Sequence, residues 1–256
     1  MVAVKKTDYL RTYRACVKHD DLSVYSIVID ETDLLISSKR VLAREAYASA
    51  LSHRQALCSF IAAHPSFQKT FRPYPLDPDA PPVVRRMIRA SVAADVGPMA
   101  AVAGAIAQAV GEDLRPLSET VLIENGGDLY VRTCKRRLVG TFAGASAFSG
   151  KVFFEVPAGA SLGICTSSGT VGYSFSYGKA DAVTAIATSA ALADAAATAV
   201  CNRIRSAGDI EGALAYAKGI SGLAGVVAVI GEDMGMWGRV SIAKESSDER
   251  LVIRIT

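Results

Sequence analysis

Apolar and polar side chains follow two different periods along the first half of the chain. From residue 13 to residue 38 they alternate around acidic turns at Asp20–Asp21 and at residues 30–33, which predicts three short antiparallel strands. Residues 41–67 instead place apolar side chains at helical spacing, and we predict a helix that ends at Pro65. Five prolines between residues 72 and 88 predict an ordered irregular loop that leads into another helix.

The second half of the chain is predicted to be rich in strands. Two β-rich runs within residues 119–133 are joined by Asn125, Gly126 and Gly127, a turn that accepts positive φ and therefore indicates a hairpin. An alanine-rich helix is predicted over residues 188–204, and further strands are predicted at residues 137–144, 151–157, 161–166, 182–187 and, divided by turns, 225–256. Helices inserted among mostly antiparallel strands give an α+β fold class.

The length of 256 residues allows a substantial core. We interpret the chain as a single domain over residues 1–256, or as two intimately packed halves at about 1–115 and 116–256. Residues 94–114 and 180–200 resemble one another weakly. An internal duplication would explain this likeness, and so would a shared bias toward alanine.

Composition narrows the classes of partner and the cellular location. A net charge of +3 is too small to imply nucleic acid, and no aromatic residues interleave with the basic clusters at residues 85–89 and 135–137. These clusters are either solvated surfaces or cations around a phosphate-bearing ligand. We expect no membrane span, because Gly, Pro or Gln interrupts each long apolar run. The first residues resemble no secretion signal and the five cysteines stand singly, so we predict a cytoplasmic protein.

The segment from Val96 to Ala109 contains one polar side chain, Gln108. Pro98 suits the first turn of a helix, and Gly97 would let a ligand approach the backbone. The unpaired amides of such a helix start suit an anion or close helix docking. We interpret Asp95 as the N-terminal cap of this helix.

Asp194 and Thr198 stand four residues apart in the second alanine-rich helix and therefore share one face. A carboxylate and a hydroxyl together suit a hard cation such as Mg²⁺. A solvated face, continued by Asn202, would show the same spacing. A carboxylate between close-packed alanine helices would instead need a partner or a cation to offset its desolvation.

Two loops carry further polar groups. Backbone N–H groups and hydroxyls near Ser168 and Gly169 could cradle a phosphate, although serine–glycine loops are common. Glu124 and Asp128 flank the hairpin turn, where simple polar ends of a hairpin explain them equally well. Cys165 is interpreted as a small strand residue in preference to a sulfur-handling group.

Taken in order, the segments "ADVGPMAAVAGAIA", "ENGGDLYV", "TSSGTVG" and "ADAAATAV" resemble those of a family of cytoplasmic, ApbE-like proteins of uncharacterised function. That family is distantly related to the ApbE flavin transferases, which use Mg²⁺ and FAD to attach FMN to a Thr or Ser of a target protein. The likeness to the uncharacterised family covers nearly the whole chain, whereas the likeness to the transferases is confined to the four motifs. The resemblance implies an ApbE-like, T-fold-like architecture.

The resemblance also implies roles for particular residues. Asp194 and Thr198 fall where the transferases have Mg²⁺ ligands, and Ala100 falls where an alanine offers its backbone carbonyl to the metal. The residues that fall near the flavin nucleotide are Gly97, Ala100, Asn125, Gly126, Gly127, Asp128, Ser168 and Gly169.

Two departures from the transferase pattern argue against FMN transfer. The transferases carry a lysine after the metal-binding alanine, where this chain has Ala101, and a His-x-x-Asp-Pro segment where this chain reads "GYSFSYGKAD". Loss of a cation beside a pyrophosphate weakens the stabilisation of its charge. We therefore predict a protein that binds FAD or another phosphate-bearing nucleotide with Mg²⁺; if it is an enzyme, we predict a metal-dependent transferase or pyrophosphatase.

Two other functions remain open at this point. One is a non-flavin accessory protein in sulfur assimilation and homocysteine formation, a process to which relatives have been linked. The other is a catalytically inactive binding or structural subunit of a homo-oligomer.

Overall fold

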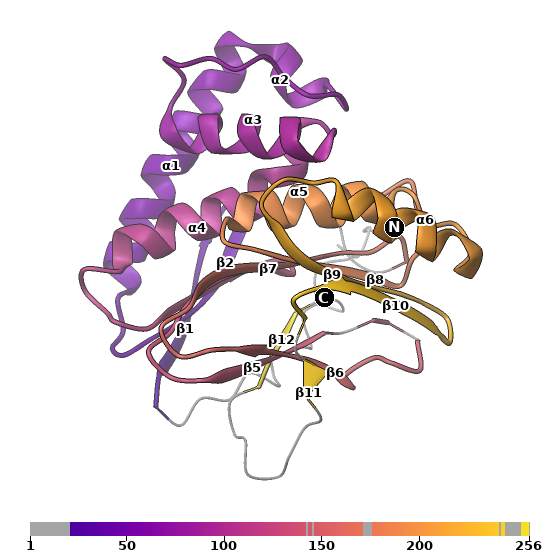
Figure 1. Ribbon diagram of the computed structural model, residues 1–256. Coiled ribbons are helices and arrows are strands. Elements are labelled where there is room, and N and C mark those ends of the chain that lie inside the picture. The colour runs from indigo at the N-terminus through magenta and orange to yellow at the C-terminus, as the bar shows by residue number, and fades with distance from the viewer. Residues whose placement is uncertain are drawn as a thin grey trace, which may run out of the picture.

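An eight-stranded antiparallel sheet forms the centre of the molecule (Figure 1). The computed structural model describes residues 21–141, 143–144, 146–170, 176–240, 242–243 and 252–255. In spatial order the strands of this main sheet are β1 (Ser23–Ile29), β2 (Thr32–Ser38), β3 (Val121–Asn125), β4 (Asp128–Arg132), β7 (Ser161–Ser167), β8 (Ala182–Ala187), β9 (Leu223–Ile230) and β10 (Asp233–Gly238). The predicted hairpin is confirmed, because β3 and β4 pair antiparallel up to Asn125 and Asp128. Gly126 and Gly127 close this turn with φ values of 65° and 105°, which favour glycine.

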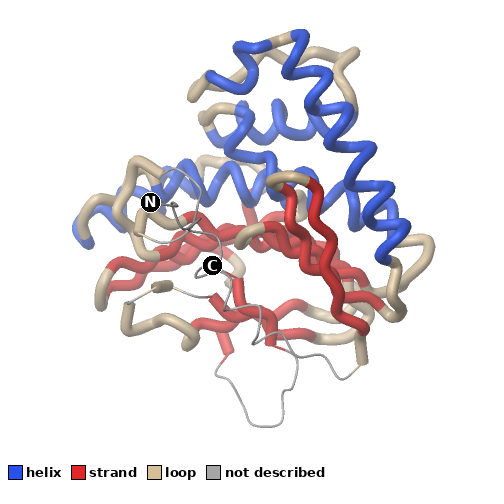
Figure 2. The backbone as a smooth tube through the Cα atoms, turned by 180° about the vertical axis from the view of Figure 1, so that it is seen from behind, coloured by secondary structure: helices blue, strands red, loops and turns tan. Residues whose placement is uncertain are grey.

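Helices cover one face of the main sheet (Figure 2). They are α1 (Ala43–Ala63), α2 (Pro65–Lys69), α3 (Pro82–Ala94), α4 (Val102–Leu114), α5 (Ala190–Cys201) and α6 (Ile210–Lys218), with 3-10 turns η2 (Pro98–Ala101) and η3 (Ala207–Asp209). Figure 1 shows α4 and α5 directly against the sheet, with α2 and α3 farther out. Their apolar faces and the sheet form one continuous core, which includes Phe67, Met87 and Ile106.

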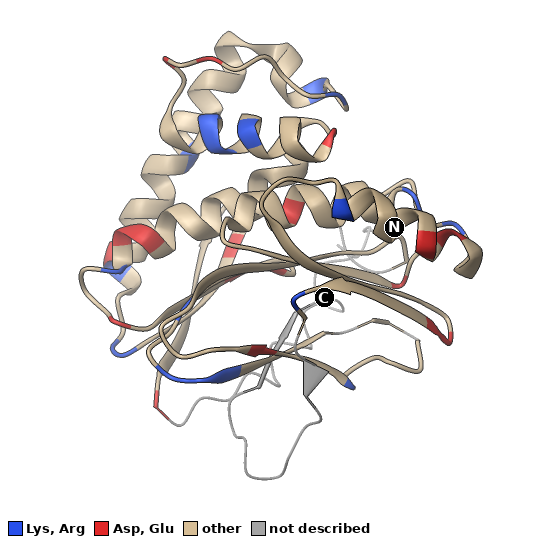
Figure 3. Cartoon of the chain, viewed as in Figure 1, with Lys and Arg blue, Asp and Glu red and all other residues tan. Residues whose placement is uncertain are grey.

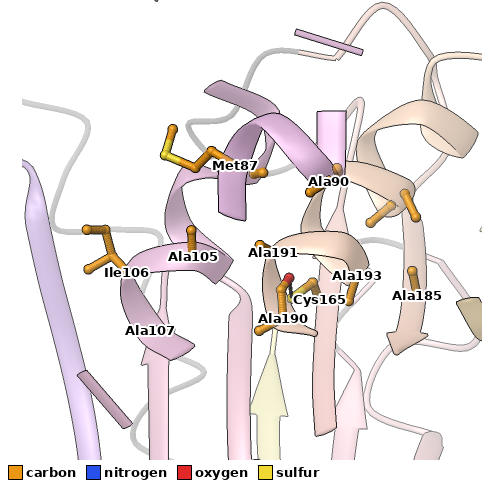
Figure 4. Close-up of a cluster of buried hydrophobic side chains, with 14 of the residues drawn as sticks. Met87, Ala90, Ala105, Ile106, Ala107, Cys165, Ala185, Ala190, Ala191 and Ala193 are labelled. Carbon is orange, nitrogen blue, oxygen red and sulfur yellow. Dashed lines mark hydrogen bonds between the residues drawn. The ribbon is translucent and has the colours of Figure 1, made fainter. Parts of the chain in front are cut away.

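Alanine and glycine in α4 and α5 allow the backbones to approach closely. A Cβ at Gly104 would lie 2.3 Å from the carbonyl oxygen of Ala190, and a Cβ at Gly163 of β7 would lie 2.2 Å from the Cα of Ala190. Figure 4 shows the small side chains of Ala105 and Ala191 in this buried cluster. A larger side chain at these contacts would push the layers apart. Tight packing therefore explains why these helices consist largely of alanine and glycine.

A smaller sheet covers the opposite face of the main sheet. Its strand order is β11 (Ile242–Ala243), β6 (Val152–Val156), β5 (Arg137–Thr141) and β12 (Val252–Ile255), with β12 parallel to β5. Leu129 and Ile164 of the main sheet form a second core with Val139 and Phe154 of the smaller one. The molecule thus has three layers, namely helices, main sheet and small sheet.

The architecture confirms the predicted α+β class and its mostly antiparallel strands. The interpretation of Asp95 as an N-terminal cap is wrong. Asp95 ends α3 in the left-handed region, with φ 49°, and Gly97 occupies the capping position before η2. An aspartate tolerates this conformation better than most side chains, so it suits the sharp turn between the two helices. The first of the three strands predicted between residues 13 and 38, which precedes the turn at Asp20–Asp21, lies outside the described ranges.

In the described ranges no single helix is long and apolar enough to cross a membrane. The bent pair Pro82–Ala94 and Pro98–Leu114 meets that test by length and composition only when the two helices are taken together, and they are bent by 107°. β2, from the first half of the chain, pairs with β3, from the second. The choice between one domain and two packed halves stays a prediction.

Candidate functional site

A cavity of about 380 Å³ lies beside α5 and is called the carboxylate cavity below. α5 contributes Asp194 and Thr198 to its wall, and β4 contributes Asp128. These two carboxylates are 66 residues apart in the sequence, and the order of strands in the main sheet brings them to one place.

Asp194 is held by the first turn of α4. Its Oδ2 accepts a hydrogen bond from the backbone N–H of Gly104 at 2.9 Å. The residue is 8% exposed. Burial raises the pKa of Asp194 to about 7, against the lowering effect of the backbone N–H groups of Gly104 and Ala103. The metal-free carboxyl group therefore takes up a proton far more readily than an exposed aspartate does.

Asp128 lies in a still less favourable environment for a negative charge. Burial raises its pKa well above the usual range, and the charges of Asp194 and Glu124 act in the same direction, while the Cys165 thiol lowers it. Oδ1 of Asp128 is buried and has no hydrogen-bond partner in the described part of the structure. A buried oxygen of this kind normally has a partner, so the unpaired atom indicates room for a ligand.

The donor set suits a hard divalent cation. Asp128, Asp194 and Thr198 all line the same cavity, and Mg²⁺ favours carboxylate and hydroxyl oxygens of the kind that these residues carry. Within the ranges that the structure describes, no Lys or Arg forms an ion pair with either carboxylate. No group of three or more His, Cys, Asp or Glu there has the spacing of a metal site, so a cation would also need hydroxyl, backbone or ligand oxygens. The unpaired Oδ1 and the oxygen chemistry fit that requirement.

Five of the residues implied by the sequence line the carboxylate cavity, namely Gly97, Ala100, Asp128, Asp194 and Thr198. Gly97 is needed there for packing, because a Cβ at this position would lie 2.1 Å from the carbonyl oxygen of Thr70. This close approach brings Phe71, the neighbour of Thr70, to the wall of the cavity.

The other implied residues do not line this cavity. Asn125 lines a neighbouring cavity of about 600 Å³ and donates its side-chain N–H to the carbonyl of Ala103 at 3.1 Å. Gly126 and Gly127 form the hairpin turn, where Glu124 accepts the N–H of Gly127 at 2.8 Å. Of the loop residues, Ser168 accepts the N–H of Thr170, and Gly169 donates its own N–H to Ala180. The hydrogen bonds shown by these groups are therefore made to neighbouring parts of the chain.

Comparison with known proteins places the chain in a family. A family model described as "AbpE bacteria" matches residues 14–223. A UPF0280 protein of Methanocaldococcus jannaschii is 38% identical over 221 residues, which cover 84% of this chain and 90% of that protein. A UPF0280 protein of Methanosphaerula palustris is 42% identical over 214 residues, covering 82% and 87%. The chain belongs to the UPF0280 family.

Solved structures show that the UPF0280 fold is ApbE-like. The flavinyl transferase ApbE of Pseudomonas stutzeri superposes with a TM-score of 0.53 at 13% identity, covering 84% of this chain and 94% of that one. The flavin transferase ApbE of Vibrio cholerae, as an H257G mutant, gives a TM-score of 0.54 at 11% identity, covering 86% and 97%. At these identities the likeness establishes the fold, and the activity has to be argued from the residues of the site.

In this UPF0280 protein the position after Ala100 does not face the cavity. Ala101 has no exposed surface and belongs to the helical core. A lysine there would have to bury its charge or displace η2. The packing around Ala101 therefore leaves no place for the lysine side chain that the transferase motif carries at this position.

Cys165 is unsuited to surface sulfur chemistry. Its side chain has no exposed surface, and its thiol donates to the carbonyl of Ala190 at 3.3 Å. Burial raises the pKa of this thiol well above its usual value, and the charges of Asp128 and Asp194 add to the effect. The group therefore stays a protonated, packed thiol, in agreement with the interpretation as a small strand residue.

Among the residues of the cavity wall that sequence reasoning missed are two aromatic side chains and an arginine. Phe71 and Tyr177 are 69% and 53% exposed, and their rings meet edge to face with centroids 5.9 Å apart. The guanidinium of Arg203 lies 3.3 Å from the centroid of the Tyr216 ring and donates to the carbonyl of Ala199 at 2.7 Å. Arg203 comes directly after Asn202, which continues the polar face of Asp194 and Thr198. This position was the one feature of the sequence that could have indicated Arg203. The two aromatic residues lie in loops without periodicity.

Proposed function

We propose that this UPF0280 protein binds a phosphate-bearing nucleotide, with FAD as the first candidate, together with Mg²⁺ in the carboxylate cavity. The observation that carries the proposal is the buried pair of Asp128 and Asp194, with Oδ1 of Asp128 unpaired among the described residues. Burying an ionised carboxylate that has no partner of opposite charge costs on the order of several kcal/mol. A cation would offset that cost.

The chain supplies ligands from three elements. Asp194 and Thr198 would hold the ion from α5 and Asp128 would hold it from β4, and Ala100 of η2 lines the same cavity. When bound, Mg²⁺ supplies positive charge and Lewis acidity to a phosphate oxygen. Without an ion the two carboxyl groups offer a phosphate no positive charge. Nucleotide binding is therefore expected to depend on the metal.

The aromatic residues favour a ligand with a planar ring. Phe71 and Tyr177 present exposed rings at the cavity, and such rings stack on flat heterocycles. The neighbouring cavity of about 600 Å³ shares Gln68, Met99, Val102 and Ala103 with the carboxylate cavity. The two cavities adjoin and together offer room for a molecule as large as a dinucleotide.

The proposal is limited to binding and does not include FMN transfer. The solved neighbours named flavin transferases share the fold. In this chain Ala101 is packed in the core, where the transferase motif carries lysine. Arg203 is the cation in the cavity wall, and its guanidinium is already engaged with Tyr216 and Ala199. Stabilisation of a developing charge on pyrophosphate is correspondingly weaker.

The test is a titration of FAD into the purified protein, followed by flavin fluorescence, in Mg²⁺ and in EDTA. We expect binding in Mg²⁺ and a loss of at least about tenfold in affinity in EDTA. Asp128→Asn and Asp194→Asn should each lose the metal response. Asp233→Asn, at an exposed aspartate, is the matched control and should behave as the wild type.

Two results would contradict the proposal. One is FAD affinity that is the same in EDTA as in Mg²⁺, and the other is binding that survives both cavity substitutions. Chromatography of the same mixtures for FMN and AMP shows whether binding is followed by cleavage.

A further inference from the structure

A second cavity of about 490 Å³ lies between α3, α4 and the start of α5 and is called the arginine cavity below. Its wall includes Arg85, Arg86 and Arg89 of α3, Gln108 of α4 and Ser189 before α5. The described residues that line it differ from all those that line the carboxylate cavity. Figure 3 shows basic residues gathered on α3. The structure therefore separates this cluster from the two buried aspartates.

The three guanidinium groups are arranged differently. Arg85 is fixed by the carbonyl oxygens of Pro78 and Ala80, at 3.0 and 2.8 Å. Arg86 pairs with Glu112 at 2.7 Å. Arg89 is exposed and makes no hydrogen bond or ion pair with the residues that the structure describes. Three positive charges and the single negative charge of Glu112 leave the cavity positive.

One residue of the arginine cavity wall, Gln108 of α4, is a buried polar group that binds the start of α5. Gln108 is 8% exposed, and its Oε1 accepts the backbone N–H of Ala190 at 2.8 Å and the Ser189 hydroxyl at 3.2 Å. Its Nε2 donates to Glu112 at 2.8 Å. These bonds fix the N-terminal end of α5, a helix of 12 residues, against the cavity. That end carries the positive pole of the helix dipole, which adds to the charge of the arginines.

We propose that the arginine cavity is a second anion site that binds a phosphate-bearing small molecule independently of the carboxylate cavity. Its volume lies within the roughly 300–1,000 Å³ typical of small-molecule pockets. Arginine presents a planar fork of donors that matches phosphate oxygens, and Arg89 is free to turn toward a ligand. None of the described residues that line the cavity is aromatic, so recognition rests on the phosphate more than on a base.

A chelator separates this site from the proposed nucleotide site. In EDTA the carboxylate cavity lacks the metal charge on which its proposed phosphate binding depends, whereas the arginine cavity needs no metal. We therefore expect calorimetry in EDTA to detect binding of pyrophosphate, with the same affinity in the wild type and in Asp194→Asn. Parallel titrations with inorganic phosphate and AMP distinguish the source of the phosphate. Equal affinities indicate a free anion, and tighter binding of AMP indicates a nucleotide.

Substitutions on α3 locate the site. Arg89→Ala is expected to weaken pyrophosphate binding at least about tenfold, and Arg89→Lys, which keeps the charge, should fall between it and the wild type. Arg115→Ala removes an exposed arginine that does not line the cavity and should leave binding unchanged. Thermal unfolding checks that each variant is folded.

Three outcomes overturn the proposal. They are an absence of pyrophosphate binding in EDTA, binding that survives Arg89→Ala combined with Arg86→Ala, and binding that is lost in Asp194→Asn. None of these depends on whether FAD and Mg²⁺ bind in the carboxylate cavity, so the two proposals fail separately.

Discussion

Aspartates occur in two contrasting environments in this molecule. Near the small sheet, Asp21 accepts hydrogen bonds from Arg137 at 3.2 to 3.4 Å, and Arg137 has a fully buried side chain. In the carboxylate cavity, Asp128 and Asp194 face one another without an arginine or lysine paired to either in the described ranges. The first arrangement is complete as it stands, and the second needs a proton or a cation.

The pKa values of the two regions move in opposite directions. Burial alone would raise the pKa of Asp21, yet Arg137, together with Lys39 and Lys135, outweighs it and lowers the value to about 2. Burial raises the pKa of Asp194 to about 7 because nothing of opposite charge compensates it. The same residue type therefore stabilises the fold in one place and carries a cost in the other, a pattern typical of functional sites.

The largest expected change in stability comes from removing the ion pair between Asp21 and Arg137. Asp21→Ala should lower the free energy of unfolding by about 3–5 kcal/mol, because Arg137 remains buried without its carboxylate. Urea unfolding at pH 7 measures the change. Adding Arg137→Met should recover a large part of the loss, since the buried charge disappears with its partner. Asp233→Ala is the exposed control, and a loss at Asp21 no larger than this control would contradict the comparison.

Lowering the pH should remove the stabilisation that Asp21 provides. The contribution of Asp21 is fully present above its unfolded pKa of 3.8 and is lost as the pH falls toward its folded pKa of about 2. The charge-linked part amounts to about 2.5 kcal/mol. We therefore expect the stability difference between the wild type and Asp21→Asn to shrink steadily from pH 5 to pH 2 in urea titrations. A difference that stays constant over this range would show that the charge of Asp21 is not what stabilises the fold.

Much of the fold could be predicted from local pattern, because hairpins and amphipathic helices depend on neighbouring residues. The turn at Gly126 and Gly127 and the strands around it are examples. The turn at Asp95 could not be read correctly. Nothing nearby in the sequence shows that the helix before it runs to Ala94, so a cap at the end of one helix looks like a cap at the start of the next.

The candidate site shows the same limit more strongly. The spacing of Asp194 and Thr198 in one helix gave a cation hypothesis from sequence. The proximity of Asp128 depends on the order of strands in the main sheet, which spacing does not reveal. The separation of the arginine cluster from the aspartates likewise depends on how α3 packs against α4 and α5. Contacts between segments that are distant in the sequence therefore determine which polar residues come together in each cavity.

The smallest expected change has the opposite sign and tests the uncompensated region. In EDTA at pH 8, Asp128→Asn should raise the free energy of unfolding by about 1–2 kcal/mol, because on folding the aspartate must either bury a charge beside Asp194 or take up a proton. A carboxyl group with a raised pKa contributes most to stability at low pH and loses that contribution as the pH rises toward its folded pKa. The gain should therefore disappear at pH 4.

At pH 8, excess Mg²⁺ should make the wild type more stable than Asp128→Asn, the reverse of the order expected in EDTA. The wild type is expected to gain stability as the ion binds Asp128 and Asp194, while Asp128→Asn gains little. Thermal unfolding of both proteins with and without Mg²⁺ measures this, with Asp233→Asn as the control for general effects of the substitution. A variant less stable than the wild type in EDTA would show that Asp128 already has a compensating partner, and the contrast with Asp21 would then not hold.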